Sequence, residues 1–202
     1  MIRAAFIDKD GTLIDNVPHN VNPELVTLAP GAAAALELLA SQGFHPIVVS
    51  NQPGIADGRF TASALAAVER RIRELLAPAR AMIDAFYYCP HSADQGCRCR
   101  KPAPGLLLDA AADHDVDLAR SWMVGDILDD VEAGRRAGCR AALVVNGNET
   151  VWQLGPFRTP DVVARSLDAA ARWIVDADCK PHARLHRPPQ ENAVAPRMAR
   201  RR

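Results

Sequence analysis

The sequence reads Ala4-Ala5-Phe6-Ile7-Asp8-Lys9-Asp10-Gly11-Thr12 near its start, an apolar run that stops at two aspartates and a glycine. A short apolar run predicts a buried strand, and the glycine after it predicts a turn. Ligand and catalytic groups of open α/β folds gather where the strands end, so Asp8 and Asp10 would lie together at such an edge. Two close carboxylates can bind Mg²⁺ there, and one can attack a substrate while the other transfers protons.

Apolar runs of strand length alternate with Ala- and Leu-rich segments through the following part of the chain. We expect strands at 4–7, 46–50, 85–88, 121–125 and 141–145, and helices at 32–41, 62–76, 106–115, 128–137 and 167–175. Thr61 is the expected N-cap of the second helix, and Gly138 is the expected C-terminal stop of the fourth. Strands that are apolar throughout and alternate with helices predict an α/β three-layer sandwich, Rossmann-like, around a parallel sheet.

The length of 202 residues suits one domain with a sizeable core, which we expect to span residues 1–178. Lys and Arg number 24 and so do Asp and Glu, and this balance argues against nucleic acid or a membrane as a partner. We expect no signal peptide, because residues 1–3 lead directly into a strand, and no apolar stretch approaches the ~20 residues of a membrane span. Residues 179–202 are mostly basic, contain prolines and lack periodicity, which predicts a disordered tail.

Polar residues also mark the ends of other expected strands. Ser50 ends the second strand, Asp126 follows the fourth, and Lys101 lies between the third and the fourth. Right-handed crossovers bring the ends of parallel strands to one crevice, so we expect these residues beside Asp8. Carboxylates would hold Mg²⁺ there, while Ser50 and Lys101 would bind the oxygens of a phosphoryl group. Each residue alone could belong to a polar turn or to the surface, but together they predict phosphate-ester chemistry.

A second metal site is predicted between the third and fourth strands. Its four candidate ligands are Cys89, His91, Cys97 and Cys99. Three thiolates and one imidazole form a closed tetrahedral set, which is typical of structural zinc, and three unrelated reduced cysteines near a histidine are the alternative. The odd total of five cysteines argues against a disulfide framework and favours a reducing, cytoplasmic setting. Zinc would hold the adjoining Arg100 and Lys101 in place, and Arg100 would either contact a substrate phosphate or carboxylate or lie in solvent.

Four motifs of the chain together resemble the haloacid dehalogenase superfamily of phosphatases. They are Asp8-Lys9-Asp10-Gly11-Thr12-Leu13, Ser50-Asn51, Lys101-Pro102, and Gly125-Asp126 with Asp130. The resemblance implies that Asp8 attacks phosphorus and that Asp10 protonates the leaving alcohol and later activates water. It also implies Mg²⁺ ligands from the Asp8 carboxylate, the Asp10 main-chain carbonyl and Asp126. The intervals between the motifs leave no room for a separate cap domain, so an open active site is expected.

Within the superfamily, the resemblance is to its capless members with a zinc loop, and it extends over residues 4–145. Asn51-Gln52-Pro53-Gly54-Ile55-Ala56 and Tyr87-Tyr88-Cys89-Pro90-His91 look more like the phosphatases of D-glycero-D-manno-heptose 1,7-bisphosphate than like histidinol-phosphatases. Ile127 stands where the heptose enzymes usually have a lysine, so histidinol phosphate or another sugar phosphate remains an alternative substrate. The implied substrate contacts are Asn16, His19, Ser50, Asn51, Gln52, Pro53, Arg100 and Lys101.

Two further functions would be compatible with the same fold. A non-catalytic binding module would be expected to lack Asp8 or Asp10, and both are present. A nucleic-acid 3′-phosphatase would need a basic patch within the domain, which the sequence does not indicate. We therefore expect a monomeric enzyme that acts on a small phosphorylated molecule, with neither nucleic acid nor a membrane as its partner.

Overall fold

The structure, a computed structural model, describes residues 1–179. In this part of the chain six strands form one parallel sheet in the order β3-β2-β1-β4-β5-β6. The strands are β1 (Arg3–Ile7), β2 (Phe44–Asn51), β3 (Ala85–Cys89), β4 (Trp122–Gly125), β5 (Arg140–Val144) and β6 (Val162–Ala164). The predicted parallel sheet is confirmed, with one strand more than expected. Apart from Cys179, the predicted tail lies outside the described residues.

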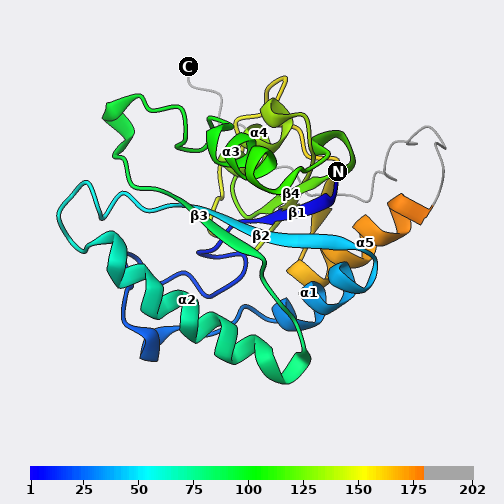
Figure 1. Ribbon diagram of the computed structural model, residues 1–202. Helices are drawn as coiled ribbons and strands as arrows, with labels where there is room; N and C mark the ends of the chain where they lie inside the picture. Colours follow the sequence, from blue (N-terminus) through cyan, green and yellow to red (C-terminus); the bar gives the residue numbers. More distant parts are fainter. Residues whose placement is uncertain (180–202) are drawn as a thin grey trace, which may run out of the picture.

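Helices cover both faces of the sheet, which gives the predicted three layers (Figure 1). The helices are α1 (Ala32–Ser41), α2 (Ala62–Leu76), α3 (Gly105–His114), α4 (Leu128–Ala137) and α5 (Leu167–Cys179), with short 3₁₀ helices at Pro23–Leu25, Ala77–Ala79, Ala93–Gln95 and Leu118–Arg120. Helices α3 and α4 cover one face, while α1, α2 and α5 cover the other (Figure 1). Among residues 1–179, no helix has both the length and the apolar character that crossing a membrane requires.

The central strand β1 is buried on both of its faces. Ala5 and Ile7 belong to the apolar core formed with α1, α2 and α5, whereas Ala4 and Phe6 belong to the core formed with α3 and α4. All four side chains are fully buried. A strand that packs against helices on both sides has no position for a polar side chain, which explains why its sequence is apolar without alternation.

Most of the expected elements are found with ends shifted by one or two residues, and larger differences from the sequence prediction concern β6, α5 and the cap of α2. Strand β6 is not predicted, because three residues are too few to form a pattern, and its pairing with β5 defines it. Helix α5 continues to Cys179, beyond the predicted end at residue 175. Thr61 precedes α2 as predicted, but its hydroxyl bonds to Ser63 Oγ at 2.9 Å and does not cap the helix backbone. Gly138 ends α4 with a left-handed φ of 97°, as predicted.

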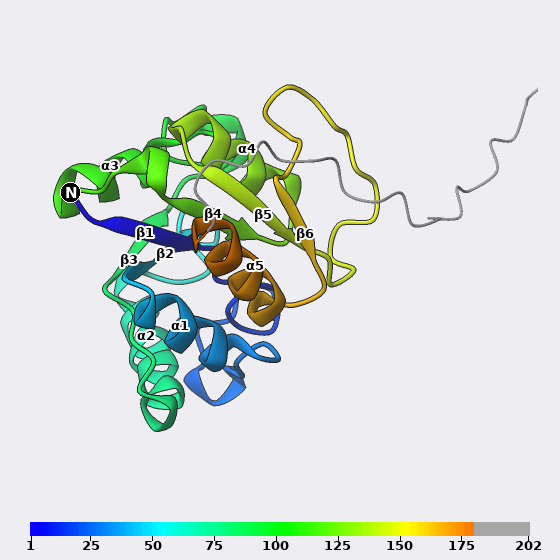
Figure 2. The same cartoon turned by 90° about the vertical axis from the view of Figure 1, so that its right-hand side faces the viewer.

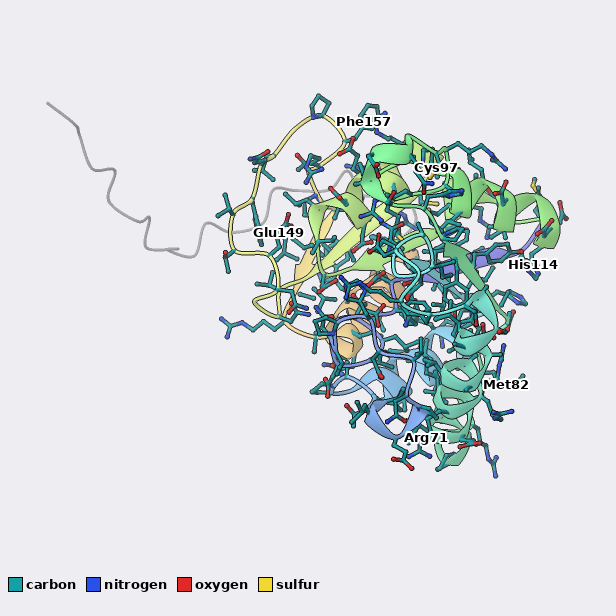
Figure 3. The ribbon with its side chains drawn as sticks, turned by 90° about the vertical axis from the view of Figure 1, so that its left-hand side faces the viewer. Arg71, Met82, Cys97, His114, Glu149 and Phe157 are labelled. Atoms are coloured by element: carbon teal, nitrogen blue, oxygen red, sulfur yellow. The ribbon has the colours of Figure 1, made fainter. Side chains whose placement is uncertain are left out.

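The parallel strands all end at one edge of the sheet, which faces the viewer in Figure 3. β1 and β4 are neighbours at the centre, and the strand order runs outwards from them in opposite directions, to β2 and β3 on one side and to β5 and β6 on the other. Such a reversal opens a crevice at the strand ends, where α/β proteins bind ligands. The loop that carries Cys97 and the loop that carries Glu149 and Phe157 both lie at this edge (Figure 3), and the latter loop extends well beyond the sheet (Figure 2).

Candidate active site

Three buried carboxylates meet at the ends of β1 and β4. Asp8 follows β1, Asp126 follows β4, and Asp130 lies in the first turn of α4. One oxygen from each lies within 4.8 Å of the others, and all three residues are at most 7% exposed. Opposite ligands of an octahedral Mg²⁺ site are about 4.2 Å apart, so this set of oxygens fits one such ion. The fold therefore brings Asp8 and Asp126 together, and Asp130, which the predicted ligand set leaves out, joins them.

Lys101 offsets part of this negative charge. Its Nζ lies 2.5 Å from Asp8 Oδ1 and 2.6 Å from Asp130 Oδ1. Burial alone would lower the pKa of Lys101, but the carboxylates of Asp130 and Asp8 raise it above its ordinary value. Burial raises the pKa of Asp8 well above its ordinary value, Lys101 opposes this, and the neighbouring carboxylates add to it. The site thus holds more negative charge than its lysine compensates, which favours the binding of a cation.

Asn51 and Gly125, which lie beside the carboxylates, hold Lys101 and Asp130 in these positions. Asn51 at the end of β2 binds the main chain of Lys101, since its Nδ2 donates to Lys101 O at 3.1 Å and its Oδ1 accepts from Lys101 N at 3.0 Å. Gly125 at the end of β4 leaves room for Asp130, because a Cβ at Gly125 would lie 2.2 Å from Asp130 Oδ2. The amide therefore holds the lysine in the crevice, and the glycine admits the carboxylate beside it.

Asp10 has different surroundings from Asp8, although only one residue separates them. Gln52 Nε2 donates to Asp10 Oδ2 and to Ser50 Oγ, both at 2.8 Å. Lys9 Nζ lies 3.0 Å from Asp10 Oδ1, and the Lys9 side chain is 1% exposed whereas that of Asp10 is 29% exposed. A partly open carboxylate that is held at both oxygens can exchange a proton with a substrate or with water. The sequence prediction omits Lys9, because a lysine beside two aspartates is ordinarily a surface residue and only the fold buries it.

Amide groups from the loop after β5 bind Asp126. Asn148 Nδ2 donates to Asp126 Oδ2 at 2.6 Å, and Asn146 Nδ2 donates to the same oxygen at 3.2 Å. Asn146 Nδ2 also donates to Gly11 O at 2.6 Å, and Thr12 Oγ1 lies 3.4 Å from Asp126 Oδ1. The sequence prediction includes neither asparagine. The signal that could have found them is their position two and four residues after the end of β5, at the same edge of the sheet as Asp126 after β4.

Four other predicted substrate contacts have different surroundings: Arg100 and Asn16 line cavities, Pro53 lies in a turn, and His19 is exposed. Arg100 lines a cavity of about 480 Å³ between the zinc loop (residues 89–99) and α4, and its Nη1 donates to His91 O at 3.2 Å. Asn16 lines a second cavity of about 310 Å³. Pro53 is half-buried in the turn after β2. His19 is exposed with φ 55°, and its side chain makes no hydrogen bond or ion pair within residues 1–179. The structure thus does not join His19 to the carboxylates.

The four predicted zinc ligands lie together in the zinc loop. Cys99 Sγ lies 3.3 Å from Cys89 Sγ, 3.5 Å from Cys97 Sγ and 3.3 Å from His91 Nδ1. Tetrahedral zinc with bonds of about 2.3 Å to sulfur separates its sulfur ligands by about 3.8 Å, so these donors fit one closed site. Burial opposes ionisation of the Cys97 thiol, yet hydrogen bonds from Arg100 N and within the cluster lower its pKa to about 7. The cluster is compatible with structural zinc.

Known proteins are similar to this chain in sequence. A family model described as "HAD-hyrolase-like" matches residues 98–170. The D-glycero-D-manno-heptose-1,7-bisphosphate 7-phosphatase of Thermosynechococcus vestitus is 38% identical over 185 residues, which cover 85% of this chain and 94% of that one. The D-glycero-beta-D-manno-heptose-1,7-bisphosphate 7-phosphatase of Bordetella bronchiseptica is 36% identical over 148 residues, which cover 73% of this chain and 83% of that one.

A solved structure agrees with these relatives. The crystal structure of the D,D-heptose 1,7-bisphosphate phosphatase from B. bronchiseptica, complexed with magnesium and phosphate, is 34% identical to this chain. It superimposes with a TM-score of 0.78 and covers 87% of this chain and 99% of that one. The resemblance read from the four motifs is therefore confirmed by sequence and by fold. The chain is a phosphoric monoester hydrolase and belongs to the haloacid dehalogenase-like phosphatases, in the family that contains the D-glycero-D-manno-heptose 1,7-bisphosphate 7-phosphatases.

Proposed function

We propose that this phosphatase removes the 7-phosphate of D-glycero-D-manno-heptose 1,7-bisphosphate through an aspartyl-phosphate intermediate on Asp8, with Mg²⁺ as its cofactor. The observation that carries the proposal is the buried group of Asp8, Asp126 and Asp130 around Lys101. The substrate is supported by relatives named for this activity, one of them 38% identical to the chain. The B. bronchiseptica structure, which holds magnesium and phosphate, supports the cofactor.

In the first step, an oxygen of Asp8 attacks phosphorus. Lys101 holds Asp8 Oδ1 at 2.5 Å, which orients the carboxylate and leaves its second oxygen for the new O–P bond. The bond between phosphorus and the sugar oxygen breaks, and Asp10 gives its proton to that oxygen, so the alcohol leaves as a neutral group. Lys101 and Ser50 bind the phosphoryl oxygens while the transition state forms.

In the second step, Asp10 takes a proton from water, and the resulting hydroxide attacks phosphorus. The O–P bond to Asp8 breaks, which releases inorganic phosphate and restores the carboxylate. Gln52 and Lys9 contact the two oxygens of Asp10 at 2.8 and 3.0 Å, and so keep its carboxyl group in one place for both proton transfers. One difficult displacement is thereby replaced by two easier ones.

Residues of the chain would hold both proposed metal ions. Bound Mg²⁺ would supply the positive charge that offsets the repulsion between Asp8 and the phosphate. Its ligands would be the Asp8 carboxylate, the Asp10 main-chain carbonyl and Asp126, with Asp130 beside them as the partner of Lys101. The proposed ligands of structural Zn²⁺ are Cys89, His91, Cys97 and Cys99. Zinc there would fix the loop that leads into Lys101.

Recognition of the second phosphate would decide the specificity. Arg100 lines the cavity beside the zinc loop, and its planar guanidinium suits a phosphate. Ile127, half-buried just before α4, offers no charge to that group. The remaining proposed contacts are Asn16, His19, Ser50, Asn51, Gln52, Pro53 and Lys101.

Phosphate release by the purified, Mg²⁺-supplied enzyme tests the proposal. The substrates are heptose 1,7-bisphosphate, histidinol phosphate and a panel of sugar phosphates, and ³¹P NMR identifies which phosphate leaves the bisphosphate. We expect a preference of at least about tenfold in kcat/KM for the bisphosphate, with loss of its 7-phosphate. Preference for histidinol phosphate or another sugar phosphate would refute the proposed substrate but not the proposed aspartyl-phosphate mechanism. Wild-type turnover by Asp8→Asn would refute the mechanism.

A further inference from the structure

The loop that leaves β5 begins with Asn146-Gly147-Asn148-Glu149, here named the asparagine strap. Asn148 makes the short bond to Asp126 Oδ2, and its main-chain N donates to Asn146 Oδ1 at 3.0 Å. Asn146 in turn reaches both Asp126 Oδ2 and Gly11 O. The strap therefore connects the ends of three neighbouring strands, because it starts at β5, binds the residue after β4 and binds the turn after β1.

The contact between the strap and the turn after β1 depends on a glycine. A Cβ at Gly11 would lie 2.3 Å from Asp126 Oδ2 and 2.4 Å from Asn148 Nδ2. Gly11 also has a φ of 92°, a conformation that strains residues with side chains. The glycine of the Asp-x-Asp-Gly-Thr motif thus leaves the space in which the amide of Asn148 meets the carboxylate of Asp126.

The far end of the strap is fixed to α4. Glu149 Oε2 accepts a hydrogen bond from Leu128 N at 2.7 Å, at the start of the helix. Arg158, farther along the same loop, lies 2.8 Å from Asp129 Oδ1 and 2.7 Å from Glu132 Oε2. The loop is therefore held to the protein on both sides of the exposed apolar residues between them, Val151, Trp152, Leu154 and Phe157. These attachments hold the strap in position relative to the carboxylates.

The strap binds its carboxylate with neutral donors. A lysine or arginine at position 146 or 148 would form an ion pair with Asp126 and compete with a metal ion for its carboxylate. A neutral amide donates hydrogen bonds to the carboxylate, offsets only part of its charge and leaves it able to bind a cation. The two asparagines occupy Oδ2, whereas the one hydrogen bond to Oδ1 from residues 1–179 is the weak contact with Thr12 at 3.4 Å. Oδ1 is thus the oxygen left for an ion shared with Asp8.

We propose that Asn146 and Asn148 are positioning residues that set the Mg²⁺ affinity of the site by fixing the carboxylate of Asp126. The inference rests on the proposed function, because that function assigns Mg²⁺ to Asp8 and Asp126. Groups that hold a metal ligand typically contribute about 10- to 100-fold in metal affinity, so the loss of one amide weakens Mg²⁺ binding about tenfold or more. Asn148 makes the shorter contact and has the larger effect.

Calorimetric titration of Mg²⁺ into substrate-free protein tests this inference. Asn148→Ala and Asn146→Ala are compared with wild type, and Asp126→Asn serves as the variant that lacks the ligand. Gln153→Ala is the matched control, because Gln153 is an exposed amide of the same loop. The Mg²⁺ Kd rises about tenfold or more in both asparagine variants, stays unchanged in Gln153→Ala and becomes unmeasurable in Asp126→Asn. Wild-type affinity in both asparagine variants would overturn the inference.

Separate readouts distinguish this inference from a loss of fold and from the proposed substrate. Urea denaturation and zinc content identify a variant that has not folded, and Asn148→Ser then replaces the alanine variant. In the folded variants, the Mg²⁺ concentration for half-maximal rate rises by the same factor as Kd. A wild-type protein that binds Mg²⁺ without hydrolysing the heptose bisphosphate would refute the proposed substrate alone. A wild-type protein that binds no Mg²⁺ would overturn the inference as well.

Discussion

Replacing Lys101 by methionine tests the charge balance of the active site. Lys101→Met retains much of the length of the side chain but removes the cation that pairs with Asp8 and Asp130. Both carboxylates then lack their cationic partner in a region where neither is more than 7% exposed. We expect the variant to be less stable than wild type in Mg²⁺-free buffer at pH 8, and added Mg²⁺ to restore part of the loss.

Removing one partner of a buried ion pair costs about 3–5 kcal/mol. For a chain of 202 residues this corresponds to a fall in Tm of about 6–20 °C. The loss depends on pH, because burial already raises the pKa of Asp8 and that of Asp130 with Lys101 present, and removal of the lysine raises both further. A carboxyl group with a raised pKa in the folded state destabilises the fold as the pH rises through that pKa. The difference between variant and wild type is therefore largest at high pH and shrinks as the carboxyl groups become protonated.

Urea denaturation at pH 5 and pH 8, followed by the fluorescence of the buried Trp122, measures the free energy of unfolding. Arg120→Met is the control, because Arg120 is exposed and forms no ion pair within residues 1–179, and it should change stability by no more than about 0.5 kcal/mol. A loss in Lys101→Met no larger than that of a surface pair, about 1 kcal/mol, would refute the reasoning. So would a loss as large at pH 5 as at pH 8.

Three other substitutions have defined outcomes. Asp8→Asn should lower phosphate release by at least about 10⁴-fold in a folded, zinc-containing protein, and a wild-type rate would contradict its role as nucleophile. Cys97→Ser should lower zinc content and stability together, since structural zinc contributes on the order of 10 kcal/mol to small sites; wild-type protein that holds no zinc in reducing buffer would contradict this. Gly11→Ala should destabilise the fold by at least about 1 kcal/mol, because of its φ of 92°. It should also weaken Mg²⁺ binding through Asp126 and Asn148, and calorimetry with an unchanged Kd would exclude that effect.

The order of strands and helices could be predicted because a strand buried on both faces has an uninterrupted apolar sequence, which is easy to recognise. The run Ala4-Ala5-Phe6-Ile7 before Asp8 is apolar at every position, as expected of a central strand that helices cover on both faces. β6 has no such pattern, because it is only three residues long and Val163 in its middle is 55% exposed. Hydrogen bonds to β5 define this strand, and they belong to the tertiary structure.

The site could be predicted only as far as the topology determines it. Asp8, Asp126 and Lys101 could be expected together, because parallel strands bring their ends to one edge. Lys9 and Asn148 could not, because their contacts depend on how individual loops turn. The bond from Asn148 to Asp126 is a clear case, since no sequence pattern separates an asparagine that reaches a carboxylate from one that lies in solvent.

The central position of β1 also affects how the protein can assemble during synthesis. In the sheet, Ile7 lies beside Val124, although more than a hundred residues separate them in the chain. Ribosomes add about 5–20 residues per second, so roughly 6–23 s pass between the synthesis of these two strands. Until β4 emerges, one edge of β1 has no partner and Asp8 lacks the neighbouring carboxylates of Asp126 and Asp130. Unpaired strand edges are prone to aggregate. The growing chain can therefore complete its carboxylate cluster only late, and the edge of β1 that pairs with β4 stays unpaired in the interval.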